Sequence, residues 1–424
     1  MKNHYPVVIV GGGQAGLSLS YCLKEKGIEH IIFEKNTVGY SWRSKRWDSF
    51  CLVTPNWQCK LPGYHYADKD PHGFMQRDDI VKYIKDYAAS FGPPLNEGVE
   101  VLKVVKSNSG FEITTSIGNF TAETVAIATG SYHIPKIPPI ADEFSKSIVQ
   151  LHSSEYKNPQ SLPDTVLVIG TGQSGCQIAE DLHLEGKQVH LCVGSAPRSP
   201  RRYRGKDVVE WLDCMGYYDL PIDEHPQKDR VRAKTNHYVT GRDGGREINL
   251  RQFALEGMQL YGTLKHISNR HLELQSNLKQ HLDGADAVAE KIKQNIDEFI
   301  DTHHIQAPVE PAYKPVWEPE IEVCQLDYHE ANIQAVVWCT GYQSDFNWIE
   351  IPVFDDKGYP MHNRGVTEVE GLYFLGLPWL YTWGSGRFSG IARDAGYLES
   401  RISDCLSLSP VSRESTLENT YVKH

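Results

Sequence analysis

The chain has 424 residues and a formal net charge of −11, with 40% hydrophobic and 23% charged residues. A chain of this length exceeds what one hydrophobic core usually organises, so two domains are expected. The negative charge argues against a polyanion-binding surface, and nucleic acid is not an expected partner. Nine scattered cysteines without a C-x-x-C pair suit a reducing compartment and argue against a metal site and a disulfide framework.

The N-terminal residues and the apolar runs of the sequence indicate in which compartment the protein is expected. The first strand is expected to begin within six residues, which leaves no room for a targeting peptide. No apolar run approaches the roughly 20 residues that a membrane-spanning helix needs. We therefore expect a cytoplasmic protein that does not bind a membrane. The sequence leaves open whether the protein forms a homodimer.

The N-terminal segment VVIVGGGQAGLSLSYCLKEKGIEHIIFEK predicts a nucleotide cradle. Residues 7–10 predict a buried parallel strand, 17–26 a helix and 30–33 a second strand. Glycines at the G-x-G-x-x-G spacing allow a tight turn, close approach of a pyrophosphate to backbone N–H groups and close helix packing. Glu34 can accept both hydroxyls of an adenosine ribose. The residues assigned to this site are Gly11, Gly13, Gln14, Ala15, Gly16, Glu34 and Lys35.

The segment VLVIGTGQSGCQIAEDLHLEGKQVHLCVG aligns with the first without a gap and predicts a second cradle. Val193 stands where the first copy has Glu34, which removes repulsion against a 2′-phosphate. Arginines in the following RSPRRYRGK have the fork geometry that suits phosphate oxygens. The residues assigned to this site are Gly170, Gly172, Gln173, Ser174, Gly175, Ser195, Arg198 and Arg201, with Arg202 as a further candidate. The alternative, that RSPRRYRGK is only a solvated basic loop, stays open.

Two cradles predict an α/β fold with two Rossmann-like dinucleotide-binding domains, one for FAD and one for NADPH. We expect hydride to pass between the two bound cofactors. Runs that end in T-G, at 125–130 and 335–342, flank the second cradle, and the proline-rich linkers YHIPKIPPI and PVEPAYKPVWEPE cannot continue a helix or a central strand. We expect a discontinuous FAD domain at 1–161 and 328–424, and an NADPH domain at 162–327 with a helical insertion at 207–299. Further expected cofactor contacts are Thr129, Gly130, Thr340, Gly341 and Tyr342.

The C-terminal part predicts a strand at 372–375, an aromatic loop and a helix at 390–402. A helix N-terminus aimed at the flavin would stabilise the negative charge of its reduced form. A helix that merely closes the domain is compatible with this role. After Leu406 the sequence is polar and is expected to be a poorly ordered tail.

With these elements placed, the chain resembles the flavin-containing monooxygenases, a class that includes plant auxin-forming enzymes and bacterial amine oxygenases. Their linker signature F-x-G-x-x-x-H-x-x-x-Y/F-K/R is matched in KSIVQLHSSEYK at His152, Tyr156 and Lys157, whereas Lys146 and Ile148 replace its Phe and Gly. Their ATGY element is similar to residues 339–342. The resemblance covers residues 1–200 and 325–405. The stretch TGRDGGREINLRQFALEGMQLYG resembles, more narrowly, bacterial FAD-dependent oxidoreductases associated with nitrilase gene clusters.

The resemblance implies that NADPH reduces FAD and that O2 adds to the reduced flavin. The resulting C4a-hydroperoxyflavin then oxygenates a small substrate at nitrogen or sulfur. It places Asn56, His152 and Arg387 as catalytic candidates, and Trp42 and Arg43 beside the flavin. Trp379, Tyr381 and Trp383 would line the flavin or the substrate entrance. Plain packing explains the aromatic residues nearly as well, and His152 is as readily a turn residue without chemistry.

Two other functions stay open. An NADPH-dependent flavoprotein reductase would pass electrons to a protein or quinone without inserting oxygen. A thioredoxin reductase is disfavoured because neither nucleotide domain has a C-x-x-C pair. A noncatalytic flavin sensor is disfavoured by the second cradle.

Overall fold

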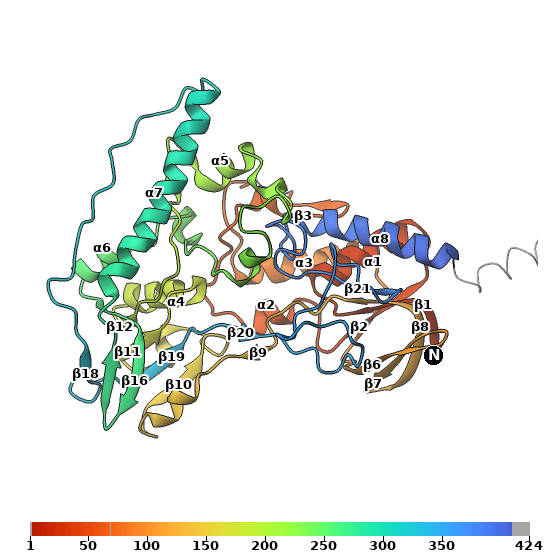
Figure 1. The fold of residues 1–424 in the computed structure, drawn as a ribbon, viewed down its shortest axis with the longest axis horizontal. Helices are drawn as coiled ribbons and strands as arrows, with labels where there is room; N and C mark the ends of the chain where they lie inside the picture. The colour runs from red at the N-terminus through yellow and green to blue at the C-terminus, as the bar shows by residue number, and fades with distance from the viewer. Residues whose placement is uncertain (1, 68, 409–424) are drawn as a thin grey trace, which may run out of the picture.

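The computed structural model describes residues 2–67 and 69–408, and two separate sheets organise its two halves (Figure 1). The first sheet contains β1 (His4–Val10), β2 (His30–Glu34), β5 (Leu95–Glu97), β6 (Val101–Ser107), β7 (Gly110–Thr115), β8 (Gly118–Ile127) and β21 (Leu372–Phe374). Its order is β5-β2-β1-β8-β7-β6, and β21 also pairs with β8. Strands β5, β2, β1, β8 and β21 run parallel, whereas β6 and β7 are antiparallel.

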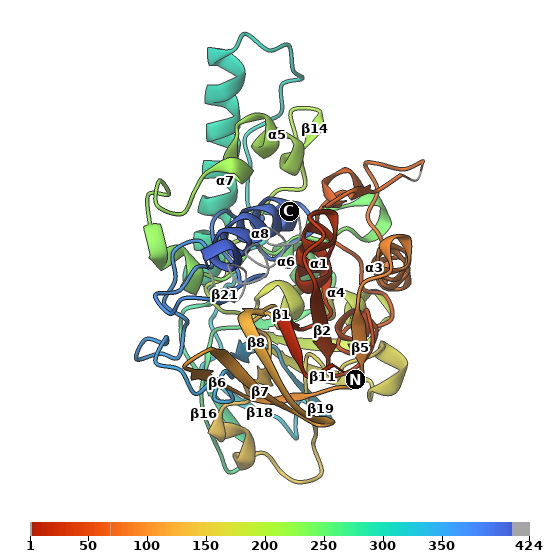
Figure 2. The same ribbon diagram turned by 90° about the vertical axis from the view of Figure 1, so that its right-hand side faces the viewer.

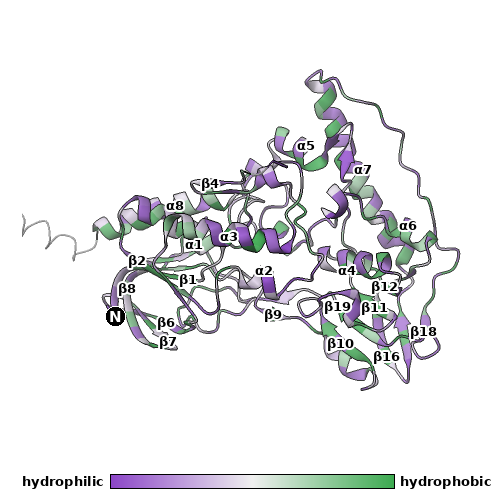
Figure 3. Ribbon diagram, turned by 180° about the vertical axis from the view of Figure 1, so that it is seen from behind, coloured by the Kyte–Doolittle hydropathy of each residue, from purple (hydrophilic) through white to green (hydrophobic). Residues whose placement is uncertain are grey.

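The second sheet has five parallel strands in the order β10-β19-β11-β12-β15. These strands are β10 (Val149–His152), β11 (Thr165–Ile169), β12 (Gln188–Cys192), β15 (Gln259–Tyr261) and β19 (Ala335–Trp338). The central strands β11 and β19 are buried along their whole length, as parallel strands covered on both faces require. Figure 3 shows hydrophobic residues along the strands of this half. The expected α/β fold with two Rossmann-like cores is confirmed.

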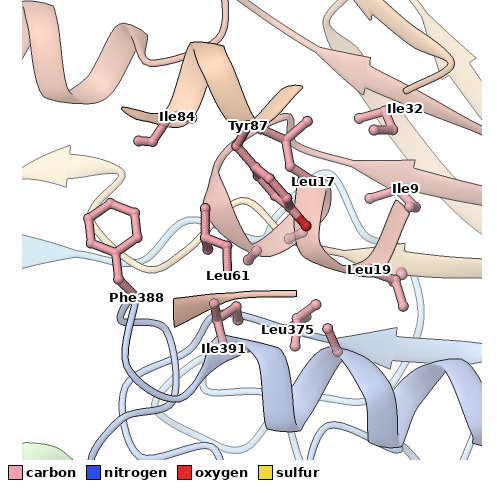
Figure 4. Packing of buried hydrophobic residues seen from close by; sticks show 14 of the residues in the cluster. Ile9, Leu17, Leu19, Ile32, Leu61, Ile84, Tyr87, Leu375, Phe388 and Ile391 are labelled. Atoms are coloured by element: carbon pink, nitrogen blue, oxygen red, sulfur yellow. The ribbon is translucent and has the colours of Figure 1, made fainter. Parts of the chain in front are cut away.

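Eight α-helices lie within the described residues. They are α1 (Gln14–Glu25), α2 (Tyr40–Ser44), α3 (Arg77–Phe91), α4 (Gln173–Leu184), α5 (Val208–Cys214), α6 (Leu250–Leu255), α7 (Leu278–Thr302) and α8 (Ile391–Leu408). Helices α1 and α8 lie side by side next to the first sheet (Figures 1 and 2). Their shared core joins residues far apart in the sequence, since Leu61, Tyr87, Phe388 and Ile391 belong to one buried cluster (Figure 4).

Short strand pairs complete the structure. They are β3 (Lys60–Leu61) with β4 (Tyr64–His65), β9 (Ile134–Pro135) with β20 (Tyr342–Gln343), β13 (Arg202–Tyr203) with β14 (Lys206–Asp207), and the sheet of β16 (Leu264–Ser268), β17 (His271–Leu274) and β18 (Gln325–Asp327). The linker at 308–320 contains neither helix nor strand, as its prolines predict. In the described part of the chain, no helix has the length and apolar character to cross a membrane.

The sheet pairing differs from the expected boundaries at 161/162 and 327/328. Those boundaries put β10 and β19 with the first cradle, but both strands belong to the second sheet, where β19 pairs with β11. The T-G run that follows β19 therefore lies at the second cradle, whereas the run that follows β8 lies at the first. Sheet partners are chosen by packing over long sequence distances, which local patterns do not report.

The stretch 207–299 is more than a helical insertion. It contains α5, α6 and most of α7, but also β15, which is an edge strand of the second sheet. The C-terminal part of α7 packs against α5 and β13 in one buried cluster, which contains Tyr203, Val208, Trp211, Ile296 and Ile300. A poorly ordered tail is expected after Leu406, but α8 runs to Leu408, and the rest of the expected tail lies outside the described residues.

Candidate functional site

The first cradle has the backbone geometry that its glycines predict. Gly11 has a φ of +107°, and a Cβ on it would lie 2.7 Å from the Ala128 carbonyl oxygen at the end of β8. A Cβ on Gly16 would lie 1.9 Å from the Gly11 oxygen, so α1 packs here in a way that only glycine allows. At Gly13 a Cβ would meet nothing within 4 Å. The turn is therefore closed at its first and third glycines and open at the second, as a pyrophosphate requires.

Glu34 lies against this turn. Its Oε2 accepts a hydrogen bond from the Gly12 N–H at 2.7 Å, and its Oε1 accepts one from the Asn36 N–H at 2.8 Å. The carboxylate is thereby held at the rim of the open turn. Thr129 and Gly130 follow β8 directly, and the Thr129 nitrogen would lie 3.2 Å from a Cβ on Gly11. The residues present fit the adenosine and pyrophosphate of a flavin dinucleotide.

The other residues assigned to the first cradle divide into two groups. Gln14 donates from Nε2 to the Gly386 carbonyl at 3.1 Å, and Ala15 is buried in the first turn of α1. Lys35 instead pairs with Glu100 at 2.6 Å on the surface.

The second cradle repeats the first. Gly170 has a φ of +101°, and a Cβ on it would lie 2.8 Å from the Cys339 oxygen at the end of β19. A Cβ on Gly175 would lie 1.9 Å from the Gly170 oxygen. A Cβ on Gly172 would meet only the Thr235 methyl, at an ordinary 3.6 Å. Gln173 donates to the Val239 carbonyl, and Ser174 occupies the first turn of α4.

The arginines expected to hold a 2′-phosphate are not free. Arg198 is 3% exposed, pairs with Asp286 at 2.6 Å and with Glu247, and packs against the Tyr313 ring. Arg201 is equally buried and pairs with Asp207. A phosphate would have to displace carboxylates from either guanidinium, so the prediction of free phosphate ligands is corrected for both residues. Ser195, three residues after the end of β12, is exposed.

The burial of Arg198 has a structural reason. Asp286 on α7 also accepts a hydrogen bond from Arg251 Nε at 2.9 Å, and Arg251 Nη2 donates to Asp283 at 2.6 Å. Arg198 therefore fixes α7 to the segment after β12, and Arg251 fixes α7 to α6. Since buried charges are tolerated only when they are paired, the cluster as a unit holds α7 in place.

The candidate catalytic residues Asn56 and His152 are occupied in internal hydrogen bonds. Asn56 is 3% exposed, accepts from the Met75 N–H at 2.8 Å and donates to the Asp70 carbonyl at 3.0 Å. His152 is fully buried, with Nε2 2.9 Å from the Gly341 oxygen and Nδ1 2.9 Å from the Ser154 hydroxyl. Burial lowers the pKa of His152, which favours a neutral ring. Both residues hold loops in place, and the catalytic interpretation is corrected for them.

The T-G run after β19 is built around His152. Gly341 has a φ of +83°, and Thr340 donates its hydroxyl to the Lys136 carbonyl. Tyr342 packs edge-on against the His152 ring at 4.9 Å and against Tyr132 at 5.3 Å. His152 thus connects the linker to the end of the strand that closes the second cradle.

The remaining signature residues join the two halves. Tyr156 donates its hydroxyl to Asp181 Oδ2 on α4 at 2.6 Å, and the other oxygen of Asp181 pairs with Arg242 at 2.6 Å. Lys157 donates to the Ser44 carbonyl at the end of α2, also at 2.6 Å. Tyr156 and Lys157 therefore tie the linker to the second and the first half, respectively.

A small cavity lies beside this junction. It has a volume of about 10 Å³ and is lined by Trp47, Ser49, Cys51, Gln177, Glu180, Thr240 and Arg242. A cavity of this size has room for about one water molecule. Its most unusual lining group is Glu180, a carboxyl that is 1% exposed and lies 3.1 Å from Arg246.

The Glu180 carboxyl is expected to make stability depend on pH. Burial raises the pKa of Glu180 from its ordinary value of 4.5 to about 7, against the opposing effect of Arg246. The pKa of Glu180 is higher in the folded than in the unfolded protein. The contribution of Glu180 to the free energy of unfolding is therefore complete below the pKa of the unfolded protein, and it is lost as the pH rises through the pKa of the folded protein. Urea unfolding between pH 4.5 and 7 should show this loss as a decrease in the free energy of unfolding of at most about 1.4 kcal/mol per pH unit.

Glu180→Gln is expected to flatten the pH dependence of the free energy of unfolding. Glu185→Gln, at the exposed end of the same helix, is the matched control and should leave the dependence unchanged. Parallel curves for Glu180→Gln and the unaltered protein would contradict this account.

The aromatic loop (residues 377–388) meets the segment 216–238 of the other half. The Ile222 N–H donates to the Tyr381 carbonyl at 2.7 Å, and Arg232 Nε donates to the Trp379 carbonyl at 3.2 Å. Trp379 is buried against Ile222 with a φ of +52°, a conformation that bulky side chains seldom adopt. The segment 216–238 thus covers the aromatic loop, which the sequence pattern did not predict.

The other aromatic and basic candidates take distinct positions. Trp42 stacks on Phe388 with ring centroids 5.7 Å apart, and Arg43 donates to the Thr37 hydroxyl at 3.1 Å on the surface. Arg387 lies over the Trp383 ring at 4.0 Å and donates from Nη2 to Asn236 Oδ1 at 3.1 Å. Of the three catalytic candidates, Arg387 alone lies at the junction between the halves with a partly exposed side chain.

Residues 8–246 match the model of the family described as pyridine nucleotide-disulphide oxidoreductase. An uncharacterized oxidoreductase, CzcO-like, from Geobacillus kaustophilus is 34% identical over 96% of this chain and 100% of its own length. The probable indole-3-pyruvate monooxygenase YUCCA10 of Arabidopsis thaliana is 33% identical over 48% of this chain and 54% of its own.

Solved structures share the fold at low identity. A mutant flavin monooxygenase from Stenotrophomonas maltophilia has a TM-score of 0.66 at 18% identity, covering 95% of this chain and 99% of its own. The bacillithiol disulfide reductase Bdr from Staphylococcus aureus has a TM-score of 0.62 at 16% identity, with the same coverage. Members of this family use FAD and NADP(H). The chain therefore belongs to the pyridine nucleotide-disulphide oxidoreductase family and is an oxidoreductase of this cofactor class.

Proposed function

We propose that the protein is an FAD- and NADPH-dependent monooxygenase that transfers one atom of O2 to a small substrate at a nucleophilic nitrogen or sulfur. The observation that carries the proposal is the link between the two cradles. Gln14, at the start of α1, binds the Gly386 carbonyl; the next residue, Arg387, binds Asn236; and Thr235 lies against Gly172. A chain of contacts thus connects the N-terminus of α1 to the N-terminus of α4, which supports a reaction between two dinucleotides bound at these ends.

The chain's own residues have defined roles in this proposal. The open backbone at Gly13 and the Glu34 carboxylate would hold the flavin dinucleotide, and the open turn at Gly172 would hold the nicotinamide dinucleotide. When bound, the flavin supplies the redox and oxygen chemistry. The segment 216–238 and the aromatic loop would limit the access of water to the junction once the nucleotides and the substrate are bound, as an oxygenase requires.

Support for oxygenation over simple electron transfer comes from two observations. The linker residues His152, Tyr156 and Lys157 match the monooxygenase signature, and Tyr156 and Lys157 tie the linker to the two halves through Asp181 and Ser44. The sequence contains no C-x-x-C pair to accept electrons from the flavin. The fold does not separate the alternatives, because a monooxygenase and a disulfide reductase share it. Membership of the group associated with nitrilase gene clusters remains part of the proposal.

The test is isotopic. Purified FAD-loaded protein is incubated with NADPH, ¹⁸O2 and a panel of amines and sulfides, and the products are analysed by mass spectrometry. We expect at least one product with one labelled oxygen atom, formed in proportion to the NADPH consumed. Omission of NADPH is the control for non-enzymatic oxidation.

The competing function is an NADPH-dependent flavoprotein reductase that does not insert oxygen. It predicts substrate-stimulated oxidation of NADPH without label in any product, together with electron delivery to an added quinone or disulfide. That combination would overturn oxygenation.

A further inference from the structure

Arg387 occupies the point where the two halves meet. Its neighbour Gly386 accepts from Gln14 at the start of α1. Its own Nη2 donates to Asn236, one residue after Thr235, whose methyl faces Gly172 at the start of α4. One guanidinium therefore stands between the two nucleotide cradles, and Asn236 on its far side is exposed.

The partners of Arg387 are uncharged. Nη1 donates to the Trp383 carbonyl and Nη2 to the Asn236 amide oxygen, and Arg387 forms no ion pair within the described residues 2–67 and 69–408. Arg198, Arg201, Arg242, Arg246, Arg251 and Arg393, which lie in or contact the other half, each pair with a carboxylate. Burial lowers the pKa of Arg387, but an arginine guanidinium is not deprotonated in proteins and stays charged at neutral pH. Arg387 thus carries a charge without a counter-ion.

The surroundings of Arg387 are aromatic. Its guanidinium lies 4.0 Å from the Trp383 ring centroid, and Trp383 packs on Tyr218 at 4.6 Å. Tyr217 meets Tyr218 edge-on at 5.5 Å. Burial raises the pKa of both phenols, so neither supplies a negative charge at neutral pH. A ligand at this point meets one cation and an apolar wall.

We propose that Arg387 binds the carboxylate of the substrate, and that the substrate is a monocarboxylate with an apolar or aromatic body. The guanidinium has five N–H donors, of which two are used by Trp383 and Asn236, so donors remain for carboxylate oxygens. A single cation matches a monoanion better than a phosphate dianion. The substrate assignment rests on the proposed function, because it takes the junction between the cradles as the reaction site.

The test measures binding to the oxidised FAD-loaded protein by calorimetry, without NADPH. The probes are phenylacetate, 3-phenylpropionate and hexanoate, each compared with its primary amide. At least one acid should bind about tenfold to hundredfold more tightly than its amide, the range of a charge-assisted hydrogen bond. Arg387→Gln should remove this preference, and Arg387→Lys should keep part of it. Arg401→Gln, which breaks an exposed ion pair on α8, is the control and should bind as the unaltered protein does.

The outcomes separate this inference from its alternatives. Equal or absent binding of every acid and its amide by the unaltered protein would overturn it. A loss of NADP⁺ affinity in Arg387→Gln with an intact acid preference would show that Arg387 holds the nucleotide instead. If Arg387→Gln does not fold, the binding data for Arg387→Lys replace it. An undiminished preference of Arg387→Lys for acids over amides would argue against recognition of the carboxylate by the forked donors of a guanidinium. Because no oxygen is consumed, failure of the oxygenase proposal leaves this binding result unaffected.

Discussion

Replacing Gly16 with alanine is expected to destabilise the first half of the protein and to abolish FAD binding, whereas Gly13→Ala should abolish or strongly weaken FAD binding alone. A Cβ on Gly16 would lie 1.9 Å from the Gly11 carbonyl oxygen, a backbone atom that cannot give way without moving β1. Overpacking of this kind costs about 1–3 kcal/mol or more. A Cβ on Gly13 touches nothing, but it occupies the space that a pyrophosphate needs.

The two variants are compared by thermal unfolding without FAD and by flavin-fluorescence titration. Gly172→Ala is the matched control in the second cradle, because its Cβ would make only an ordinary contact with Thr235. It should weaken NADP⁺ binding and leave FAD affinity intact. Unaltered FAD binding by Gly13→Ala would show that the first cradle does not hold the flavin.

Arg198→Ala is expected to destabilise the protein by about 3–5 kcal/mol, since it removes one member of a buried ion-pair cluster. Asp286 would keep Arg251, but Glu247 would lose the partner that the structure shows for it. Because Arg198 is not free to bind a phosphate, the ratio of the KM values for NADPH and NADH should stay unchanged. Chemical denaturation and steady-state kinetics with both nucleotides measure the two effects.

The control for Arg198 is Arg202→Ala. Arg202 is exposed, and its Nη2 donates to the Gly244 carbonyl at 3.2 Å. Its loss should change stability by no more than about 0.5 kcal/mol. A stable Arg198→Ala protein with a selectively raised KM for NADPH would restore the original role of Arg198 as the 2′-phosphate ligand.

Local patterns predicted both cradles because each depends on residues close together in the sequence. The strand, the three glycines and the helix of each copy lie within about one supersecondary unit, and their spacing follows from backbone geometry. The end of the second strand is equally predictable from the sequence, and Glu34 lies there, with its carboxylate against the glycine turn. These features need no knowledge of distant partners.

Residues whose roles depend on distant partners could not be predicted in this way. Arg198 has the composition of a phosphate ligand, but Asp286, which neutralises it, lies 88 positions along the chain. His152 has the signature of a functional histidine, and its acceptor Gly341 lies 189 positions away. The contact of Arg387 with Asn236 spans 151 positions. In each case the partner is set by how the two halves pack, not by a local pattern.

The most direct test of the account is the fate of the reduced flavin when it meets O2. FAD-loaded protein is reduced anaerobically with one equivalent of NADPH, mixed with oxygenated buffer in a stopped-flow instrument, and followed by flavin absorbance. If the junction retains NADP⁺ and excludes water, the absorbance spectrum of oxidised flavin should return only after a delay. Protein that is reduced with dithionite in the absence of NADP⁺ should show a shorter delay. Return of the oxidised flavin without any delay in both samples, with stoichiometric release of hydrogen peroxide, would contradict a monooxygenase.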